Sequence, residues 1–197
     1  MRMFFTFTLV LAAALAAVAL AADSNEAIPA EGGAIQVMPI MRTSVQIEYG
    51  GKVIQVDPVG KYDNVDIPYV GKFDALKTAD LILLSDIRPG NLDLDSEEIA
   101  KLRKPGAPVV MPMAVATLLG TKIQMPTVMA NGDTTTVAGV SIEAVPMYNA
   151  VHGPKAGEVY HPKGRGNGYI ITLGGSAFTL WAIPSAHPKY ARSKTST

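Results

Sequence analysis

Few side chains in this sequence could bind a metal ion or activate a water molecule. The chain has no cysteine, and its three histidines are His152, His161 and His187. A metal site would therefore need imidazole or carboxylate ligands. The best site candidate is Asp86, because it follows an apolar run, 81–84, that is typical of a buried strand. Open α/β sheets place their sites at the carboxyl ends of strands, so the sequence predicts a site at Asp86.

His161 is a second candidate, either as a metal ligand or as a substrate contact. It stands just before the glycine-rich segment 163–168. Spaced glycines let backbone amides face an anion, and basic side chains add charge. Lys163, Arg165 and Asn167 are therefore candidate anion- or substrate-binding residues, and an ordinary tight loop is the alternative explanation. We interpret His152 and His187, in loop-like stretches, as surface histidines.

Two aspartates have a functional and a purely structural interpretation. Asp57, before Pro58, either supports the site from behind or is a turn residue at the end of a strand. Asp86 either faces a ligand or pairs with Arg88, two residues on. We favour the ion pair, because burying either charge alone is costly.

Composition limits the class of protein. The chain has 197 residues, of which 48% are hydrophobic and 17% charged, so it can bury the core of one domain. Lysine plus arginine (17) equals aspartate plus glutamate (17). Without a basic field to hold a phosphate backbone, we expect no nucleic-acid partner.

The amino terminus is typical of an export signal. Arg2 precedes an apolar run, 4–20, and Ala19-Leu20-Ala21 offers the small residues of a cleavage site. We expect residues 1–22 to be a signal peptide cleaved near Ala21, which makes the protein periplasmic or secreted, without stable membrane association after cleavage. An uncleaved membrane anchor is the alternative.

The rest of the chain alternates strand and helix patterns, which indicates a mixed α/β domain. Residues 23–34 read as a flexible lead-in and 62–73 as a surface loop. The expected elements, in order, are a hairpin at 45–49 and 52–56, a strand at 81–84, a helix at 96–104, a strand at 109–111, a helix at 114–119, a hairpin at 134–137 and 140–145, and a strand at 169–173.

Four segments carry a resemblance to a known family. The segment 80–93, DLILLSDIRPGNLD, resembles the metal-binding strand and loop of the metallo-β-lactamase superfamily, in the branch that includes L-ascorbate-6-phosphate lactonase. The segments 53–58, 131–149 and 161–169 resemble the same branch, in the same order. The resemblance covers 35–175 and implies an αβ/βα layered sandwich, of which this chain has mainly the N-terminal half and part of the second sheet.

The resemblance also shows which metal ligands are altered. The branch pattern is Asp-x-His-x-Asp-His, and Asp86 matches its first position. Arg88, Gly90 and Asn91 replace the histidine, the aspartate and the final histidine. A guanidinium is always protonated and offers no lone pair to a cation. We therefore expect no metal cofactor in this chain, although intact relatives would bind zinc or another divalent ion.

The carboxyl-terminal segment 176–197 does not follow the family pattern. Relatives continue with a strand that ends in Gly-Asp-Thr, whereas this chain continues SAFTLWAIP and then a basic tail. A reading-frame shift near Gly175 is our hypothesis for this difference. Such a truncated domain would leave an open sheet edge, so we expect self-association through that edge.

The family would imply a metal-dependent hydrolase of ester, lactone or phosphate bonds, with ions activating water. With its ligands and second half missing, we expect this chain to be an exported, hydrolase-like protein without activity. The alternative is an exported module that binds a small anion through Arg88, Lys163 and Arg165. A single-metal hydrolase using Asp86 and His161 ranks last, because catalytic zinc sites usually have three protein ligands.

Overall fold

The computed structural model describes residues 25–41, 43–58, 76–87, 96–151 and 153–180. Several predicted features lie outside the described residues. They are the signal peptide, the loop at 62–73, Arg88, Gly90, Asn91, His152 and His187. Among the helices of the described part, none is long and apolar enough to cross a membrane.

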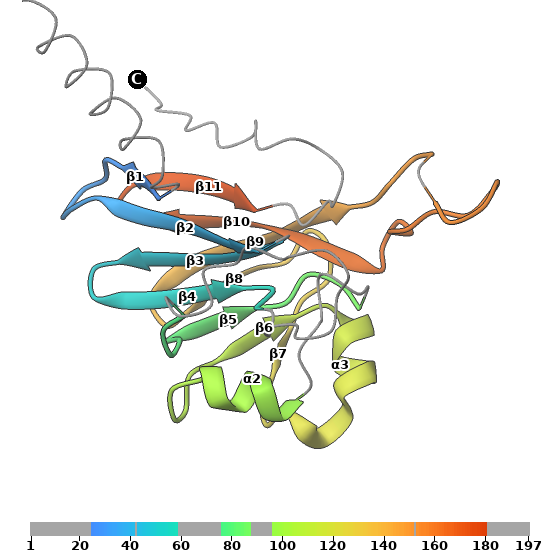
Figure 1. Cartoon of the computed structure of the whole chain (residues 1–197), viewed down its shortest axis with the longest axis horizontal. Coiled ribbons are helices and arrows are strands. Elements are labelled where there is room, and N and C mark those ends of the chain that lie inside the picture. Colours follow the sequence, from blue (N-terminus) through green and yellow to red (C-terminus); the bar gives the residue numbers. More distant parts are fainter. Residues whose placement is uncertain (1–24, 42, 59–75, 88–95, 152, 181–197) are drawn as a thin grey trace, which may run out of the picture.

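The described residues form two β-sheets (Figure 1). The larger sheet has the strand order β1-β2-β3-β4-β5-β6-β7. Its strands are β1 (Glu26–Ile28), β2 (Ile35–Met41), β3 (Ser44–Tyr49), β4 (Lys52–Val56), β5 (Leu81–Leu83), β6 (Val109–Met111) and β7 (Thr127–Val128). The smaller sheet has the order β11-β10-β9-β8. Its strands are β8 (Thr134–Val137), β9 (Val140–Met147), β10 (Gly166–Leu173) and β11 (Ser176–Leu180).

The two predicted hairpins are confirmed, and their turns explain them. Gly50 and Gly51 have φ of 55° and 76°, and Ala138 and Gly139 have φ of 52° and 74°. Two consecutive residues with positive φ form the tight turn whose twist matches paired antiparallel strands. From β4 to β7 the pairing changes to parallel. The strands β5 and β6 are buried on both faces, as their apolar runs predicted.

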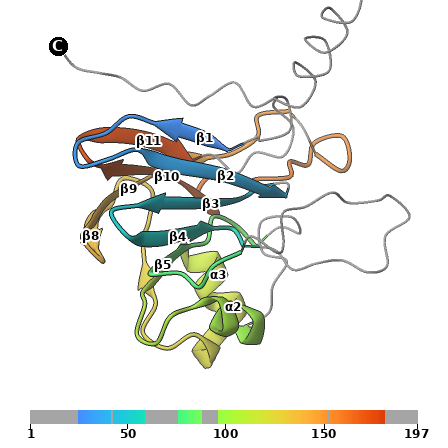
Figure 2. The same cartoon turned by 60° about the vertical axis from the view of Figure 1, so that its left-hand side comes forward.

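The buried side chains of β5 and of Leu84, which follows it, alternate between two hydrophobic clusters. Leu81 and Leu83 face the smaller sheet, where they join residues such as Ile142 and Tyr169. Ile82 and Leu84 face the helices α2 (Ser96–Leu102) and α3 (Met113–Leu119), which pack on the outer side of the larger sheet. The described residues therefore form a helix layer and two sheet layers, with β5 in the middle (Figures 1 and 2).

Helix α2 ends at Leu102, two residues before the predicted end. Pro105 disfavours helical backbone at Lys104, the residue before it. Lys104 instead donates its N–H to Ala79 O at 3.0 Å.

Three further differences from the sequence prediction concern strands. Within the predicted flexible lead-in, β1 pairs with β2 in antiparallel register. At the carboxyl end, β11 extends the smaller sheet from β10, so the first five residues of the predicted tail are part of the fold. The glycine-rich segment 163–168 is a loop only in part, because β10 already begins at Gly166.

Candidate functional site

The candidate site lies where several strands end at one edge of the two sheets. Asp57 follows β4, and Asp86 follows β5 by three residues. His161 and Arg165 belong to the connection between β9 and β10, drawn in orange in Figure 1. The fold thus brings together four of the side chains that the sequence analysis singled out.

Asp57 holds the backbone beside Asp86. Its side chain is fully buried, and its N–H donates to Leu83 O at 2.9 Å, which continues the ladder between β4 and β5. One carboxylate oxygen accepts the Ser85 N–H at 2.7 Å, and the other accepts the Ser85 hydroxyl at 2.5 Å. Its φ of 41° is a strained value for aspartate. Asp57 therefore fixes the position of Ser85, the residue before Asp86.

Asp86 accepts four hydrogen bonds on its two carboxylate oxygens. Oδ1 accepts from Ile87 N at 2.8 Å and from Arg165 Nε at 2.8 Å. Oδ2 accepts from Arg165 Nη2 at 2.6 Å and contacts His161 Nδ1 at 2.6 Å. A carboxylate offers about four lone-pair positions. The acceptor capacity of Asp86 is therefore used by the protein itself.

These bonds also set the charge of Asp86. Burial on its own raises the pKa of a carboxyl group, because it disfavours the charged form. Here the hydrogen bonds from His161, Arg165 and the Ile87 backbone outweigh burial, and the pKa of Asp86 lies below its ordinary value of 3.8. Asp86 is therefore an anion that is fully buried and balanced by a guanidinium.

His161 is held from both its backbone and its ring. Its N–H donates to Asn149 Oδ1 at 3.2 Å, and its carbonyl accepts from Asn149 N at 2.9 Å. Since the ionised carboxylate of Asp86 can only accept, Nδ1 carries the proton between them. The other ring nitrogen, Nε2, is buried and has no hydrogen-bond partner within the described part of the chain.

Arg165 reaches Asp86 because a glycine follows it. A Cβ atom added to Gly166 would lie 2.8 Å from Ser85 O and 3.2 Å from the Asp86 Cβ, so only glycine allows this approach. The Arg165 side chain is 27% exposed, and its Nη2 also donates to Tyr160 O at 2.6 Å.

Asn167 and Lys163 have other contacts in this structure. The Asn167 N–H donates to Ser85 O at 2.9 Å, and its side-chain amide donates to Met129 O and accepts from Asn131. Lys163 is exposed and lies over the Tyr148 ring, 5.8 Å from its centroid. Both side chains are therefore engaged within the protein, Asn167 in the sheet junction and Lys163 on the surface.

Asp86 forms an ion pair with Arg165, which the sequence analysis did not predict. The predicted pair of Asp86 with Arg88 stays a prediction, because Arg88 lies outside the described residues. Sequence reasoning did not predict the close approach of Gly166 to Ser85, which shapes the site. The signal for Gly166 was its place between Arg165 and Asn167, two candidates whose approach to β5 depends on it.

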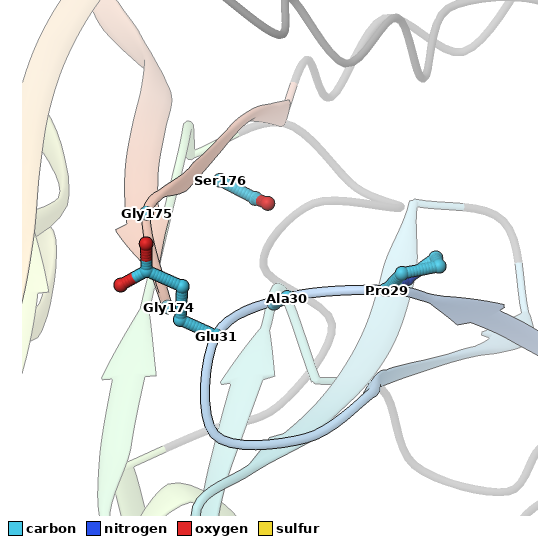
Figure 3. A pocket seen from close by; sticks show the side chains of 6 residues that line it. All are labelled: Pro29, Ala30, Glu31, Gly174, Gly175 and Ser176. Atoms are coloured by element: carbon cyan, nitrogen blue, oxygen red, sulfur yellow. The ribbon is translucent and has the colours of Figure 1, made fainter.

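A shallow pocket lies elsewhere, at the opposite end of β10. It is lined by Pro29, Ala30, Glu31, Gly174, Gly175 and Ser176 (Figure 3). Among the described residues of this lining, Glu31 is the one ionisable side chain, and acid–base chemistry usually needs a second such group.

The donor set at the candidate site does not fit a metal centre. No group of three or more histidine, cysteine, aspartate or glutamate side chains in the described ranges could hold a metal ion. Asp86 and His161 are two donors, and the acceptor positions of Asp86 are already used. Catalytic zinc sites usually have three protein ligands.

Solved structures with a similar fold include proteins described as metal-dependent hydrolases and a diiron β-hydroxylase. A protein from Parabacteroides distasonis described as a metal-dependent hydrolase is 28% identical over 80% of this chain and 64% of its own, with a TM-score of 0.64. Igni18, a metallo hydrolase from Ignicoccus hospitalis, is 16% identical over 75% of this chain and 60% of its own, with a TM-score of 0.52. CmlA, a diiron β-hydroxylase from Streptomyces venezuelae, is 16% identical over 84% of this chain and 32% of its own, with a TM-score of 0.50.

These comparisons establish a metallo-β-lactamase-like fold, as the sequence predicted. The matched region spans less than two thirds of each of these structures. Neither the protein-family models nor the curated proteins include a match to this chain. The lactonase branch stays a prediction.

Proposed function

We propose that this chain is an exported, hydrolase-like protein with a metallo-β-lactamase-like fold that has lost metal-dependent hydrolysis. The observation that carries the proposal is the saturation of Asp86 by Arg165, His161 and the Ile87 N–H. A metal ion would have to displace a guanidinium from a buried carboxylate. The sequence supports the same conclusion, because Arg88, Gly90 and Asn91 replace three donors of the family pattern.

The test is a metal and activity assay on purified protein. We expect less than stoichiometric zinc, iron or manganese after dialysis against each metal, and no hydrolysis of ester, lactone or phosphate substrates above background. An intact hydrolase of the same fold, assayed in parallel, is the positive control. Stoichiometric metal, together with turnover that a chelator abolishes, would overturn the proposal.

A second proposal is that the chain binds a small anion through Lys163 and Arg165, with Arg88. Its support is that the Arg165 side chain is partly exposed and that Lys163 is exposed two residues away. An external anion would compete with Asp86 for Arg165, so binding should be weak. Calorimetric titration with phosphate tests this, and the variant Lys163→Met should bind less; no saturable binding would contradict it.

Export is part of the first proposal and rests on the amino-terminal sequence. Cell fractionation should place the mature protein, cleaved near Ala21, outside the cytoplasm. An uncleaved chain in the cytoplasm or in the membrane fraction would contradict export.

A further inference from the structure

The sequence contains two Asn-Gly dipeptides, and the fold brings their side chains together. They are Asn131-Gly132, in the turn before β8, and Asn167-Gly168, in β10. Asn131 Nδ2 donates to Asn167 Oδ1 at 2.6 Å, although 36 positions separate the two residues in the sequence. Asparagine is thermolabile, and it deamidates most readily before glycine, which has no side chain to hinder attack by its backbone nitrogen. Two reactive dipeptides therefore share one hydrogen bond where the sheets meet.

Deamidation requires two groups within the dipeptide to meet. The backbone nitrogen of the glycine attacks Cγ of the asparagine, the new N–Cγ bond closes a succinimide ring, and the Cγ–Nδ2 bond breaks. The side-chain nitrogen leaves as ammonia, which carries away the hydrogen that the glycine nitrogen loses. Water then opens the imide at either of its two carbonyl groups, which gives aspartate or isoaspartate. Contacts that hold either reacting group away from the other therefore slow the reaction.

The contacts that hold Asn131 and Gly132 lie at an exposed turn. Gly132 N donates to Ala144 O at 2.7 Å, and Asn131 Nδ2 also donates to Gly166 O at 3.1 Å. Asn131 is half-buried and Gly132 is exposed, so water reaches the turn. Local opening of an exposed turn costs less free energy than opening of a core strand. Asn131 is therefore the asparagine of the two that should react first in the folded chain.

Asn167 is protected by the sheet junction, by which we mean its contacts with Ser85 and Met129. Asn167 is 2% exposed. Its N–H donates to Ser85 O at 2.9 Å, and its Nδ2 donates to Met129 O at 2.9 Å. Gly168, which carries the attacking nitrogen, is paired with Val145 between β10 and β9. Asn167 should therefore react only when the sheets separate at this edge.

Conversion of Asn131 to an acid would weaken the sheet junction. A carboxylate only accepts hydrogen bonds, so it would face the acceptors Asn167 Oδ1 and Gly166 O, to which the amide donated. Turning the Asn167 amide over would not remove the conflict, because its oxygen would then face Met129 O. Polar groups left without a partner inside a protein destabilise the folded arrangement.

We propose that Asn131-Gly132 is a deamidation site of the folded protein, and that its conversion opens the sheet junction and exposes Asn167-Gly168 to the same reaction. The result is an irreversible loosening of the backbone at Ser85, directly before Asp86. The proposal goes beyond the proposed function and does not depend on whether the chain binds a metal ion.

The first experiment follows the purified wild-type protein at mildly alkaline pH, in its native state and in urea. Species that differ in charge are separated by ion exchange, and their peptides are mapped by mass spectrometry, so that both conversions are assigned within one molecule. In the native state we expect Asn131 to convert first, and Asn167 to convert in molecules that already carry the change at Asn131. In urea the two should convert at comparable rates, because the contacts that order them are lost.

The second experiment installs the first product directly. Asn131→Asp places the carboxylate at the turn, and Gln124→Glu is the matched control, because it makes the same change from amide to acid at an exposed position. We expect Asn167 to convert about tenfold faster in Asn131→Asp than in wild type, which corresponds to about 1.4 kcal/mol of opening free energy. Gln124→Glu should match wild type. If Asn131→Asp does not fold, the order of conversion in native wild type decides.

Several results would overturn the proposal. Native wild type might convert Asn167 before Asn131, or convert neither while both convert in urea. A folded Asn131→Asp chain with the wild-type rate at Asn167 would exclude the coupling between the two sites. An equal acceleration in Gln124→Glu would show that added charge anywhere has the same effect, and would also refute it.

Discussion

Replacing Asp86 with asparagine should destabilise the protein more than the same change at an exposed aspartate. Asparagine keeps one oxygen and places an amide donor where the second oxygen accepted from Arg165 and His161. Breaking a fully buried ion pair costs about 3–5 kcal/mol, and the partial exposure of Arg165 reduces the expected loss to about 2–4 kcal/mol.

Asp80→Asn is the matched control. Asp80 pairs with Lys104, and both side chains are partly exposed. An exposed pair of this kind contributes about 0.2–1 kcal/mol. The amide oxygen of the substituted side chain could still accept the hydrogen bond that Val53 N donates to the carboxylate. Urea unfolding at neutral pH should therefore rank the variants as wild type, then Asp80→Asn, then Asp86→Asn in decreasing stability.

The pH dependence gives a second, independent readout. The pKa of Asp86 is lower in the folded protein than its ordinary value of 3.8. Ionised Asp86 therefore stabilises the folded state above about pH 3.8, and this contribution is lost as the pH falls through the folded-state pKa. The stability difference between wild type and Asp86→Asn should be constant near neutrality and should shrink below pH 3.8. An Asp86→Asn protein as stable as wild type at neutral pH, or a difference that persists in acid, would refute the reasoning.

Three further substitutions test the surroundings of the site, and a solution measurement tests the edge strand β11. Gly166→Ala should lower the free energy of unfolding in urea by about 1–3 kcal/mol, because its Cβ would lie 2.8 Å from the backbone oxygen of Ser85. An unchanged urea midpoint would contradict this close approach. Asp57→Ala should lower the free energy of unfolding by about 1–3 kcal/mol, and Ser85→Ala should lower it less, because only Asp57→Ala removes the acceptor of the Ser85 N–H. Equal losses of stability in the two variants would argue against that hydrogen bond. Self-association through the edge strand β11 should appear as a concentration-dependent mass in light scattering, and a monomer at all concentrations would count against it.

Local patterns were enough to predict much of the fold. The two hairpins, β5, β6 and α3 were visible because turn glycines and apolar runs act within a few residues. The strands β1, β2 and β7 were not predicted. Pro39 interrupts the pattern of β2, while β1 and β7 have three and two residues, so their pairing depends on neighbouring strands.

The candidate site could be predicted only in part, for the same physical reason. Asp86 was identified from the buried strand before it, which is a local feature. Its partner Arg165 is 79 residues away in the sequence, and their contact depends on the close passage of Gly166 beside Ser85. A pattern of residue types does not encode such an approach, because it results from packing one sheet on the other.

The two sheets are joined by hydrogen bonds near the site as well as by apolar contact. Asn167 N–H donates to Ser85 O, and the buried Tyr169 hydroxyl donates to Leu84 O at 2.8 Å. The amide proton of Asn167 can exchange with solvent deuterium only when the layers separate at this edge. Its exchange rate would therefore measure the opening of the sandwich, and not fraying of a single strand.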